Sequence, residues 1–232
     1  LIDAKVKVTE TRTDTFQIGA GFSSTESFIA NAQVSFNNLA GRGQSLSFQG
    51  QLSAIRSLFN LKFTEPWLFG SRWRFSTDLY RFQYQLPDFS RRSTGGSISL
   101  GYPISDALKL DVPGDLTVNA TYKLEDVGIS TGGTSNFDDD TSGSFFRGGL
   151  TSSFKLGVFY DDRDNRLFPT DGQYHSASVE VADDTFTLSE TEFLKYDAET
   201  RWYFPVVWDL VLRLQAELGW VTNIDPNKSV PL

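Results

Sequence analysis

The sequence predicts an all-β fold: an antiparallel, up-and-down transmembrane β-barrel of about eleven strands that is incomplete. Apolar and polar residues alternate with a period of two from residue 15 onward, which is typical of strands with two unlike faces. Most of these runs reach the roughly 9–11 residues that a tilted strand needs to cross a bilayer, against about 5–6 in soluble sheets. Long polar connections are expected on one side of the sheet and tight turns on the other, as in outer-membrane barrels.

The individual strands are placed by this alternation. The run 193–204 shows it best, because Leu194, Tyr196 and Trp202 share one face and the charged residues share the other. The long polar connection is 128–147, and the tight turns include 66–70 and 205–208. We expect strands near 15–23, 27–37, 44–54, 57–67, 72–85, 95–104, 116–127, 148–162, 173–184, 191–204 and 209–221.

A soluble β-sandwich or lipocalin-like barrel is the alternative, because its strands also alternate. Soluble strands are shorter, however, and their polar faces usually carry more Lys and Glu. Here the polar faces are rich in Ser, Thr, Asn, Gln and Gly, which suits the lumen of a membrane barrel. Aromatic residues such as Trp67, Trp73 and Trp202 gather at the turns, where an interfacial girdle is expected.

Composition excludes several classes of function. The 232 residues contain no Cys and a single His, His175, so a disulfide framework and a thiolate metal site are excluded. A His-based zinc site or a Ser-His-Asp triad has little material. The net charge of −8 argues against a nucleic-acid partner. We therefore predict no enzymatic activity, no cofactor and no bound metal.

The stretch 160–181 contains three Asp within four positions, which raises the question of a metal site. An EF-hand loop that begins at Asp162 would place Arg166 and Leu167 at its fifth and sixth positions, so the match fails. Asp and Asn instead bond local backbone, Pro fixes φ, and Gly permits positive φ. We interpret the stretch as a structural turn built from Asp164, Phe168, Pro169, Thr170 and Gly172.

Other charged residues receive structural interpretations as well. The acidic run 138–140 is expected to be a solvated loop tip, with a cation-mediated contact to lipopolysaccharide as the alternative. His175 is expected to be packed or interfacial, with nothing pairing with it. The lumenal charges are expected to form cross-strand pairs; they are Lys195, Asp197, Glu199, Arg201, Arg213 and Glu217.

Several short motifs resemble one family. A strand that ends in Asp-x-Arg-Asp-Asn and is followed by Phe-Pro-Thr-x-Gly, at 161–172, resembles a periplasmic turn of the BamA-type outer-membrane protein assembly factors of the POTRA-barrel superfamily. "FQIGAGF" at 16–22 resembles the first barrel strand of that family. "NNLAGRGQ" at 37–44 and "EPWLFG" at 65–70 resemble its first two periplasmic turns. The chain thus resembles the N-terminal part of such a barrel.

The resemblance implies a domain organisation. Residues 1–12 correspond to the end of the last periplasmic POTRA domain and a linker, and residues 13–232 to the barrel as far as the start of extracellular loop six. About eleven of the family's sixteen strands would be present. The strand count agrees with an incomplete barrel, because bacterial single-chain barrels have an even number of strands and about eleven are expected here. We expect the chain to be incomplete and to fold poorly alone, with two unpaired sheet edges.

The resemblance also implies a function at the first strand. Members of the family fold and insert nascent outer-membrane proteins in the bacterial outer membrane, with accessory lipoproteins, and contact outer-membrane lipid and lipopolysaccharide. Their first strand forms a lateral gate that pairs with client strands. Glycine weakens a strand, and a weak seam can offer backbone groups to an incoming strand. The matching edge here consists of Thr15, Phe16, Gln17, Ile18, Gly19, Ala20, Gly21, Phe22 and Ser23.

Three alternatives stay open at this point. A two-partner secretion or autotransporter-assembly transporter of the same superfamily would share these motifs. A passive porin would have a continuous water-filled lumen and no dependence on the edge of the first strand. A soluble binding barrel would stay monodisperse without detergent.

Overall fold

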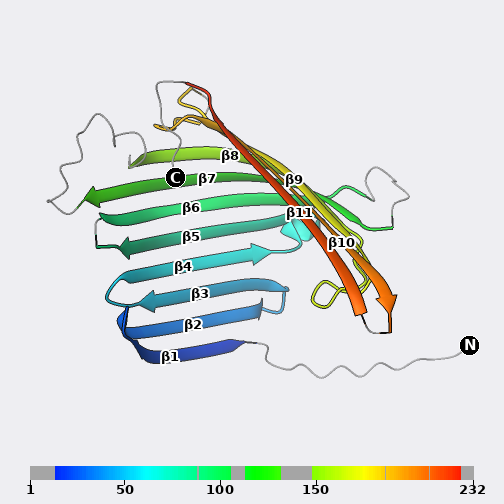
Figure 1. The fold of residues 1–232 in the computed structure, drawn as a ribbon, viewed down its shortest axis with the longest axis horizontal. Coiled ribbons are helices and arrows are strands. Elements are labelled where there is room, and N and C mark those ends of the chain that lie inside the picture. The colour runs from blue at the N-terminus through cyan, green and yellow to red at the C-terminus, as the bar shows by residue number, and fades with distance from the viewer. Residues whose placement is uncertain are drawn as a thin grey trace, which may run out of the picture.

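The computed structural model describes residues 14–87, 89–105, 113–131, 148–185, 187–208 and 210–225. They form one antiparallel sheet in which eleven strands follow one another in chain order (Figure 1). No α-helix occurs in these ranges, and so none that could cross a membrane. The strands are β1 (Thr15–Ser23), β2 (Ser27–Leu39), β3 (Gln44–Leu52), β4 (Arg56–Glu65), β5 (Arg74–Gln85), β6 (Phe89–Pro103), β7 (Asp115–Thr131), β8 (Gly149–Asp161), β9 (Gly172–Ala182), β10 (Phe193–Val207) and β11 (Leu210–Asn223).

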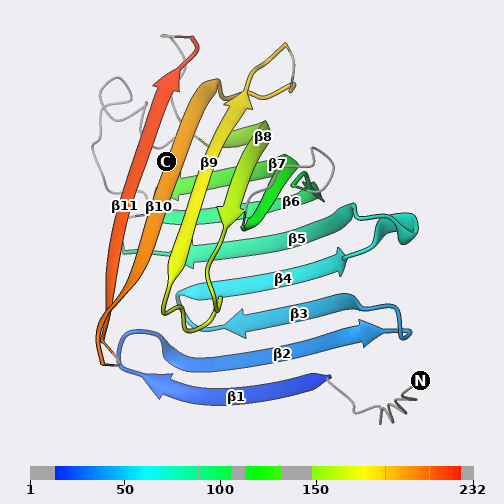
Figure 2. The same ribbon diagram turned by 90° about the vertical axis from the view of Figure 1, so that its right-hand side faces the viewer.

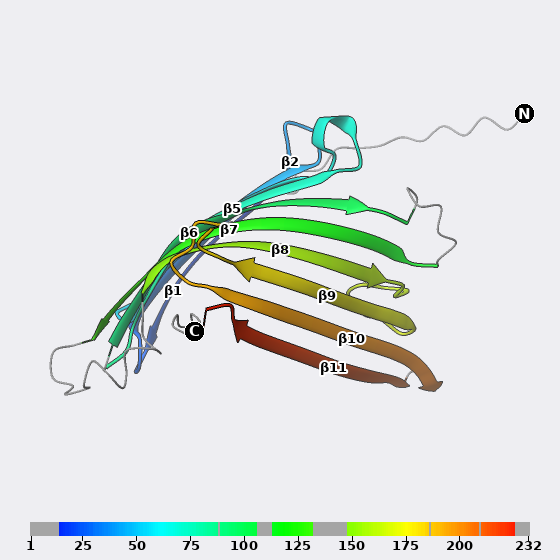
Figure 3. The same ribbon diagram turned by 90° about the horizontal axis from the view of Figure 1, so that it is seen from above.

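The sheet is twisted and open. In Figure 2, β1 to β5 run nearly horizontally whereas β9 to β11 run steeply, so the strand direction turns progressively across the sheet. Figure 3 shows from above how the sheet curves toward β11. Among the described residues β1 pairs only with β2, and β11 only with β10, so the sheet does not close. The predicted incomplete antiparallel barrel is confirmed.

The side chains show which face meets lipid. Large apolar residues such as Leu79, Ile98 and Leu212 are exposed at every second position of their strands. The part of the chain that the structure describes has thirty-seven exposed large hydrophobic residues, whereas only four hydrophobic residues are buried and one of these is an alanine. A soluble sandwich would bury these side chains between its layers, so the soluble alternative is wrong. The opposite, polar-lined face is called the lumenal face below.

Most strand bounds lie within three residues of those expected. β7 exceeds this margin at its end, which is Thr131 rather than residue 127, and β6 exceeds it at its start. β6 begins at Phe89 rather than near 95, because the polar residues 90–92 pair with both neighbouring strands. The amide of Leu86 donates to the carbonyl of Phe89 at 2.8 Å and closes the β5–β6 hairpin. Sequence alternation is weak in this polar stretch, whereas backbone pairing with β5 and β7 continues through it.

The expected asymmetry of loop lengths is wrong for several connections. On the side of the β7–β8 connection, called the loop side here, β1–β2, β3–β4 and β5–β6 are each joined by only three residues. These short connections also bond to one another, since Ala54 N donates to Glu26 O and Gln85 N to Ile55 O. The opposite side, called the turn side, has longer connections at 104–114 and 162–171.

Candidate functional site

The predicted client edge, residues 15–23, coincides with β1 (Thr15–Ser23). Its antiparallel register with β2 runs from Thr15↔Ser35 to Ser23↔Ser27 without a bulge. No described strand pairs with its other side. In an antiparallel strand, alternate residues direct both their N–H and C=O groups away from the existing partner. This edge can therefore accept a further strand along its length.

The two faces of β1 differ in chemistry. Phe16, Ile18 and Phe22 lie on the lipid-facing side with 67%, 71% and 82% of their surface exposed. Gly19 lies against the side chain of Asn31 on β2, and a Cβ at Gly19 would stand 2.3 Å from Asn31 Oδ1. A Cβ at Gly21 would meet nothing within 4 Å. A Cβ at position 19 would therefore displace the exposed Asn31 side chain, whereas position 21 has room for one.

The predicted turn lies between β8 and β9 and is organised around the carboxylate of Asp164. Asp164 Oδ1 accepts hydrogen bonds from the amides of Asn165 at 2.8 Å, Thr170 at 2.9 Å and Asp171 at 3.2 Å. Asp164 Oδ2 accepts the hydroxyl of Thr170 at 2.5 Å. The bonds from Thr170 are the largest cause that lowers the pKa of Asp164 to about 2. Its carboxylate is occupied by the turn itself.

The remaining residues of this turn have separate places. Phe168 is 80% exposed, and Asn165 Oδ1 accepts its amide at 3.1 Å. Pro169 follows it, one residue before Thr170. Gly172 begins β9 with φ +104°, and a Cβ there would lie 2.3 Å from the carbonyl oxygen of Asp162. Glycine is required here by both backbone conformation and space.

Asp161, three residues before Asp164, is held by arginines. Arg163 Nε and Nη2 donate to the two carboxylate oxygens of Asp161 at 2.7 and 2.8 Å, which raises the pKa of Arg163. Arg166 donates to Asp115 at the start of β7 at 2.8 Å and lies 3.3 Å from Asp161. Within the described ranges, no group of three or more His, Cys, Asp or Glu residues could hold a metal ion.

His175 has partners that the sequence did not indicate, so the expectation that nothing pairs with it is wrong. Its Nδ1 lies 2.8 Å from the hydroxyl of Thr200, which stands directly opposite on β10. Its ring stacks on Tyr160 at 6.0 Å and meets the edge of Trp202 at 5.0 Å. His175 thus belongs to an aromatic cluster near the turn side.

The lumenal ion pairs differ in direction from those expected. Lys195 pairs with Asp197 at 3.3 Å and Arg201 with Glu199 at 2.6 Å, in both cases along β10. Directly across from Glu199 stands Glu217, a like charge. Cross-strand contacts come from Gln215, which donates to Glu199 at 2.8 Å, and from Lys155 on β8, 3.6 Å from Asp197. The acidic run 138–140 lies outside the described residues.

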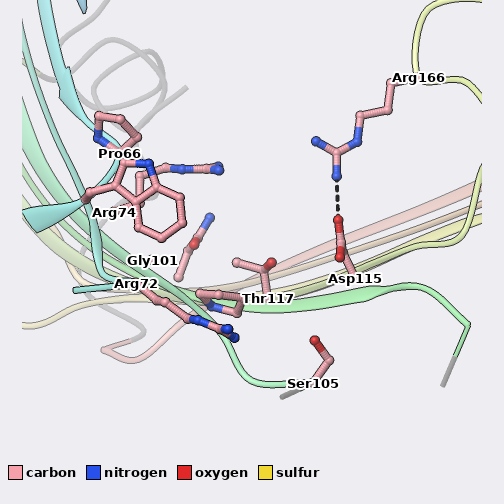
Figure 4. A pocket seen from close by; sticks show the side chains of 11 residues that line it. Pro66, Arg72, Arg74, Gly101, Ser105, Asp115, Thr117 and Arg166 are labelled. Atoms are coloured by element: carbon pink, nitrogen blue, oxygen red, sulfur yellow. Dashed lines mark hydrogen bonds and ion pairs between the residues drawn. The ribbon is translucent and has the colours of Figure 1, made fainter. Parts of the chain in front are cut away.

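A cavity that sequence reasoning missed lies at the turn-side end of the lumenal face (Figure 4). It has a volume of about 480 Å³ and is lined by residues of β5, β6 and β7 and of the β4–β5, β6–β7 and β8–β9 connections. Arg72 and Arg74 lie on one side of it, and the Arg166–Asp115 ion pair lies on the other. In the sequence these residues are only three arginines in or beside turns. Nothing there indicates that they lie close together in space.

Comparison with known proteins gives a consistent result. A family model described as the Omp85 superfamily domain matches residues 38–232. The chain is 22% identical over 99% of its length to outer membrane protein assembly factor BamA of Neisseria meningitidis serogroup B. It is 25% identical over 98% of its length to sorting and assembly machinery component 50 homolog A of Xenopus laevis. These matches span 30% and 46% of the two relatives, so the chain corresponds to less than half of either.

The fold has a solved counterpart. The crystal structure of BamA from Haemophilus ducreyi lacking POTRA domains 1–3 superposes with a TM-score of 0.67 over 96% of this chain and 43% of that chain. The sequence identity is 17%, so this likeness concerns the fold. It agrees with the architecture described above.

Proposed function

The chain belongs to the Omp85 superfamily, and on that premise we propose that it is the N-terminal part of a barrel that folds and inserts outer-membrane proteins. A barrel of this family and fold lies in the bacterial outer membrane. Relatives named for assembly in bacteria and in Xenopus match nearly the whole chain. Their shared role supports assembly, and it supports a role without catalytic chemistry.

The observation that carries the mechanism is the edge of β1. Nine residues in unbroken register with β2 leave their other side without a strand partner among the described residues. We propose that this edge templates the last strand of a client by β-augmentation. Backbone hydrogen bonds would align the client, and the exposed apolar face would continue onto it, so that apolar burial in lipid drives insertion.

The same proposal includes partners and boundaries. The clients are nascent outer-membrane proteins, and accessory lipoproteins and outer-membrane lipids, lipopolysaccharide among them, are the other partners. The POTRA end at residues 1–12 and the start of loop six lie outside the described residues, so these boundaries rest on the sequence motifs. The barrel portion begins in our proposal at residue 13, just before β1.

Cysteine crosslinking in the full-length parent tests the templating edge. Single cysteines are placed at each of positions 15–23, and disulfides to a cysteine in the C-terminal strand of a client are measured during assembly. The 232 residues contain no native Cys. We expect crosslinks whose client position changes in step with the β1 position, because paired strands hold one register.

Leu79→Cys, on the lipid-facing side of the interior strand β5, is the matched control and should give no crosslink. Crosslinks only to the parent's own last strand would contradict templating and favour a transporter or a porin. Crosslinks spread evenly over client positions would indicate collision rather than pairing.

A further inference from the structure

The turn-side cavity is lined mainly by positive side chains, whereas the chain as a whole is acidic. The chain carries a net charge of −8, yet the residues that line the cavity include three arginines and one aspartate. That aspartate, Asp115, is already paired with Arg166 at 2.8 Å. A concave site lined by one sign of charge concentrates ligands of the opposite sign. The cavity is therefore suited to an anion.

At least one positive side chain of the cavity is available to bind a ligand. The guanidinium of Arg74 makes no hydrogen bond or ion pair with the residues that the structure describes. In Figure 4, Arg72 and Arg74 lie across the cavity from Arg166. Asn119 also lines the cavity and lies beside Gly101, where an added Cβ would stand 2.3 Å from Asn119 Oδ1. Guanidinium and amide groups are the donors that bind carboxylates well.

The walls and the place of the cavity indicate what carries the carboxylate. Pro66, Trp67 and Pro103 give an apolar side, and about 480 Å³ is far more than an inorganic anion fills. The cavity opens on the lumenal face, away from the lipid-facing residues, so a membrane lipid does not reach it. A polypeptide with acidic side chains fits both the charge and the size.

We propose that this cavity binds the carboxylate side chains of an extended polypeptide segment that approaches from the turn side. The choice of a polypeptide rests on the proposed assembly function, because unfolded clients would reach the barrel on that side. The cavity would hold the client near the lumen while β1 pairs with its last strand. It is a second contact, distinct from the β1 edge.

Fluorescence anisotropy on the full-length parent in detergent micelles tests the site. The probes are a short fluorescein-labelled peptide of Gly, Ser and Asp and a matched peptide with Asn in place of every Asp. We expect the Asp peptide to bind the wild type about tenfold more tightly than the Asn peptide, because ionised acceptors bond more strongly. The double variant Arg72→Gln/Arg74→Gln should lose about that tenfold preference.

A matched control removes two positive charges elsewhere. Arg81 and Arg92 are exposed on the lipid-facing side of β5 and β6, so Arg81→Gln/Arg92→Gln should leave the peptide affinity unchanged. Equal affinity of the wild type for both peptides would overturn the proposal. Equal loss in both double variants would also overturn it, because net charge alone would then explain binding.

Two further measurements keep the test decisive. If Arg72→Gln/Arg74→Gln fails to fold, Arg72→Lys/Arg74→Lys keeps the charge and should retain most of the preference for Asp. Inorganic phosphate should displace the peptide no better than chloride at equal ionic strength; specific displacement would make this a small-anion site and overturn the proposal. Client crosslinks at β1 are read separately, so either function can fail without the other.

Discussion

At the scale of the residue, Asp164 shows how a cluster of acidic side chains can be structural. Three aspartates within four positions suggest a metal site, yet Asp161 is held by Arg163 and Asp164 by the amides and hydroxyl of its own turn. The carboxylate of Asp164 therefore accepts hydrogen bonds from four donors of its own turn. Without it, these donors would bond to water.

The lowered pKa of Asp164 predicts a pH dependence of stability. Its pKa is about 2 in the folded chain against an ordinary value of 3.8. A group whose pKa is lowered by folding stabilises the fold above its unfolded pKa, and this contribution is lost as pH falls. We expect the wild-type barrel to lose heat resistance between about pH 4 and pH 2, measured as the temperature at which the folded band disappears in semi-native gels.

Asp164→Asn should lower that temperature by a few degrees at neutral pH and flatten its decline in this acidic range. The control is Asp162→Asn, because the Asp162 carboxylate makes no hydrogen bond or ion pair with the described residues. The same acid-dependent decline in wild type and Asp164→Asn would contradict the assigned role.

At the scale of the element, the β1–β2 hairpin contains two glycines with different effects on its packing. Gly19→Ala places a methyl group 2.3 Å from Asn31 Oδ1, so the Asn31 side chain must move. Because Asn31 is exposed and the clashing atom is the far end of its flexible side chain, the cost should lie at or below the low end of the about 1–3 kcal/mol of core overpacking. Gly21→Ala meets open space and should stabilise the fold by about 0.4–1 kcal/mol, because it restricts the unfolded chain. Equilibrium unfolding of the full-length parent in urea with detergent measures both.

Asn31→Ala should rescue Gly19→Ala, because it removes the atom that the new methyl group meets. The two changes together should cost less than the sum of the single changes, with a coupling energy of about 0.5–3 kcal/mol. Strict additivity would show that Gly19 is present for strand flexibility rather than for packing against Asn31.

The strands were largely predictable because, in a membrane barrel, every second residue of a strand is apolar and faces lipid. Leu79 and Leu212 stand on the outer face as their alternation with polar neighbours indicates. The start of β6 was missed because residues 90–94 are polar on both faces, and only pairing with β5 and β7 holds them in the sheet. The partners of His175 were missed because register between strands, which places Thr200 opposite, is not a property of one strand.

The cavity at the turn side was unpredictable for the same reason. Arg74 and Arg166 are 92 positions apart, and each alone is an ordinary surface residue near a turn. They meet because β5, β6 and β7 end at the same side of the sheet and the β8–β9 turn reaches back to Asp115. Spatial convergence of turns depends on sheet topology and curvature, which a single sequence indicates only through a family.

At the scale of the whole molecule, the sheet exposes more apolar surface than a water-soluble protein can carry. Thirty-seven large hydrophobic residues are exposed, and only four hydrophobic residues among those described are buried. The stability of such a sheet depends on lipid on one face and on closure of its edges. Interior packing of the kind that stabilises a soluble domain is nearly absent from the described residues.

We therefore predict that the isolated 232-residue polypeptide does not form a stable monomer without detergent. β1 and β11 are 9 and 14 residues long, and each has one edge without a strand partner in the described ranges. Unpaired edges beside an apolar face favour pairing between chains. Analytical ultracentrifugation should show aggregates, and circular dichroism should show a broad thermal transition. The full-length parent, refolded in the same detergent series, is the control and should give one folded species wherever detergent is present. A detergent-free monomer with a sharp, cooperative unfolding transition would contradict this prediction, because it would require this sheet to bury its apolar face without lipid and without its missing neighbours.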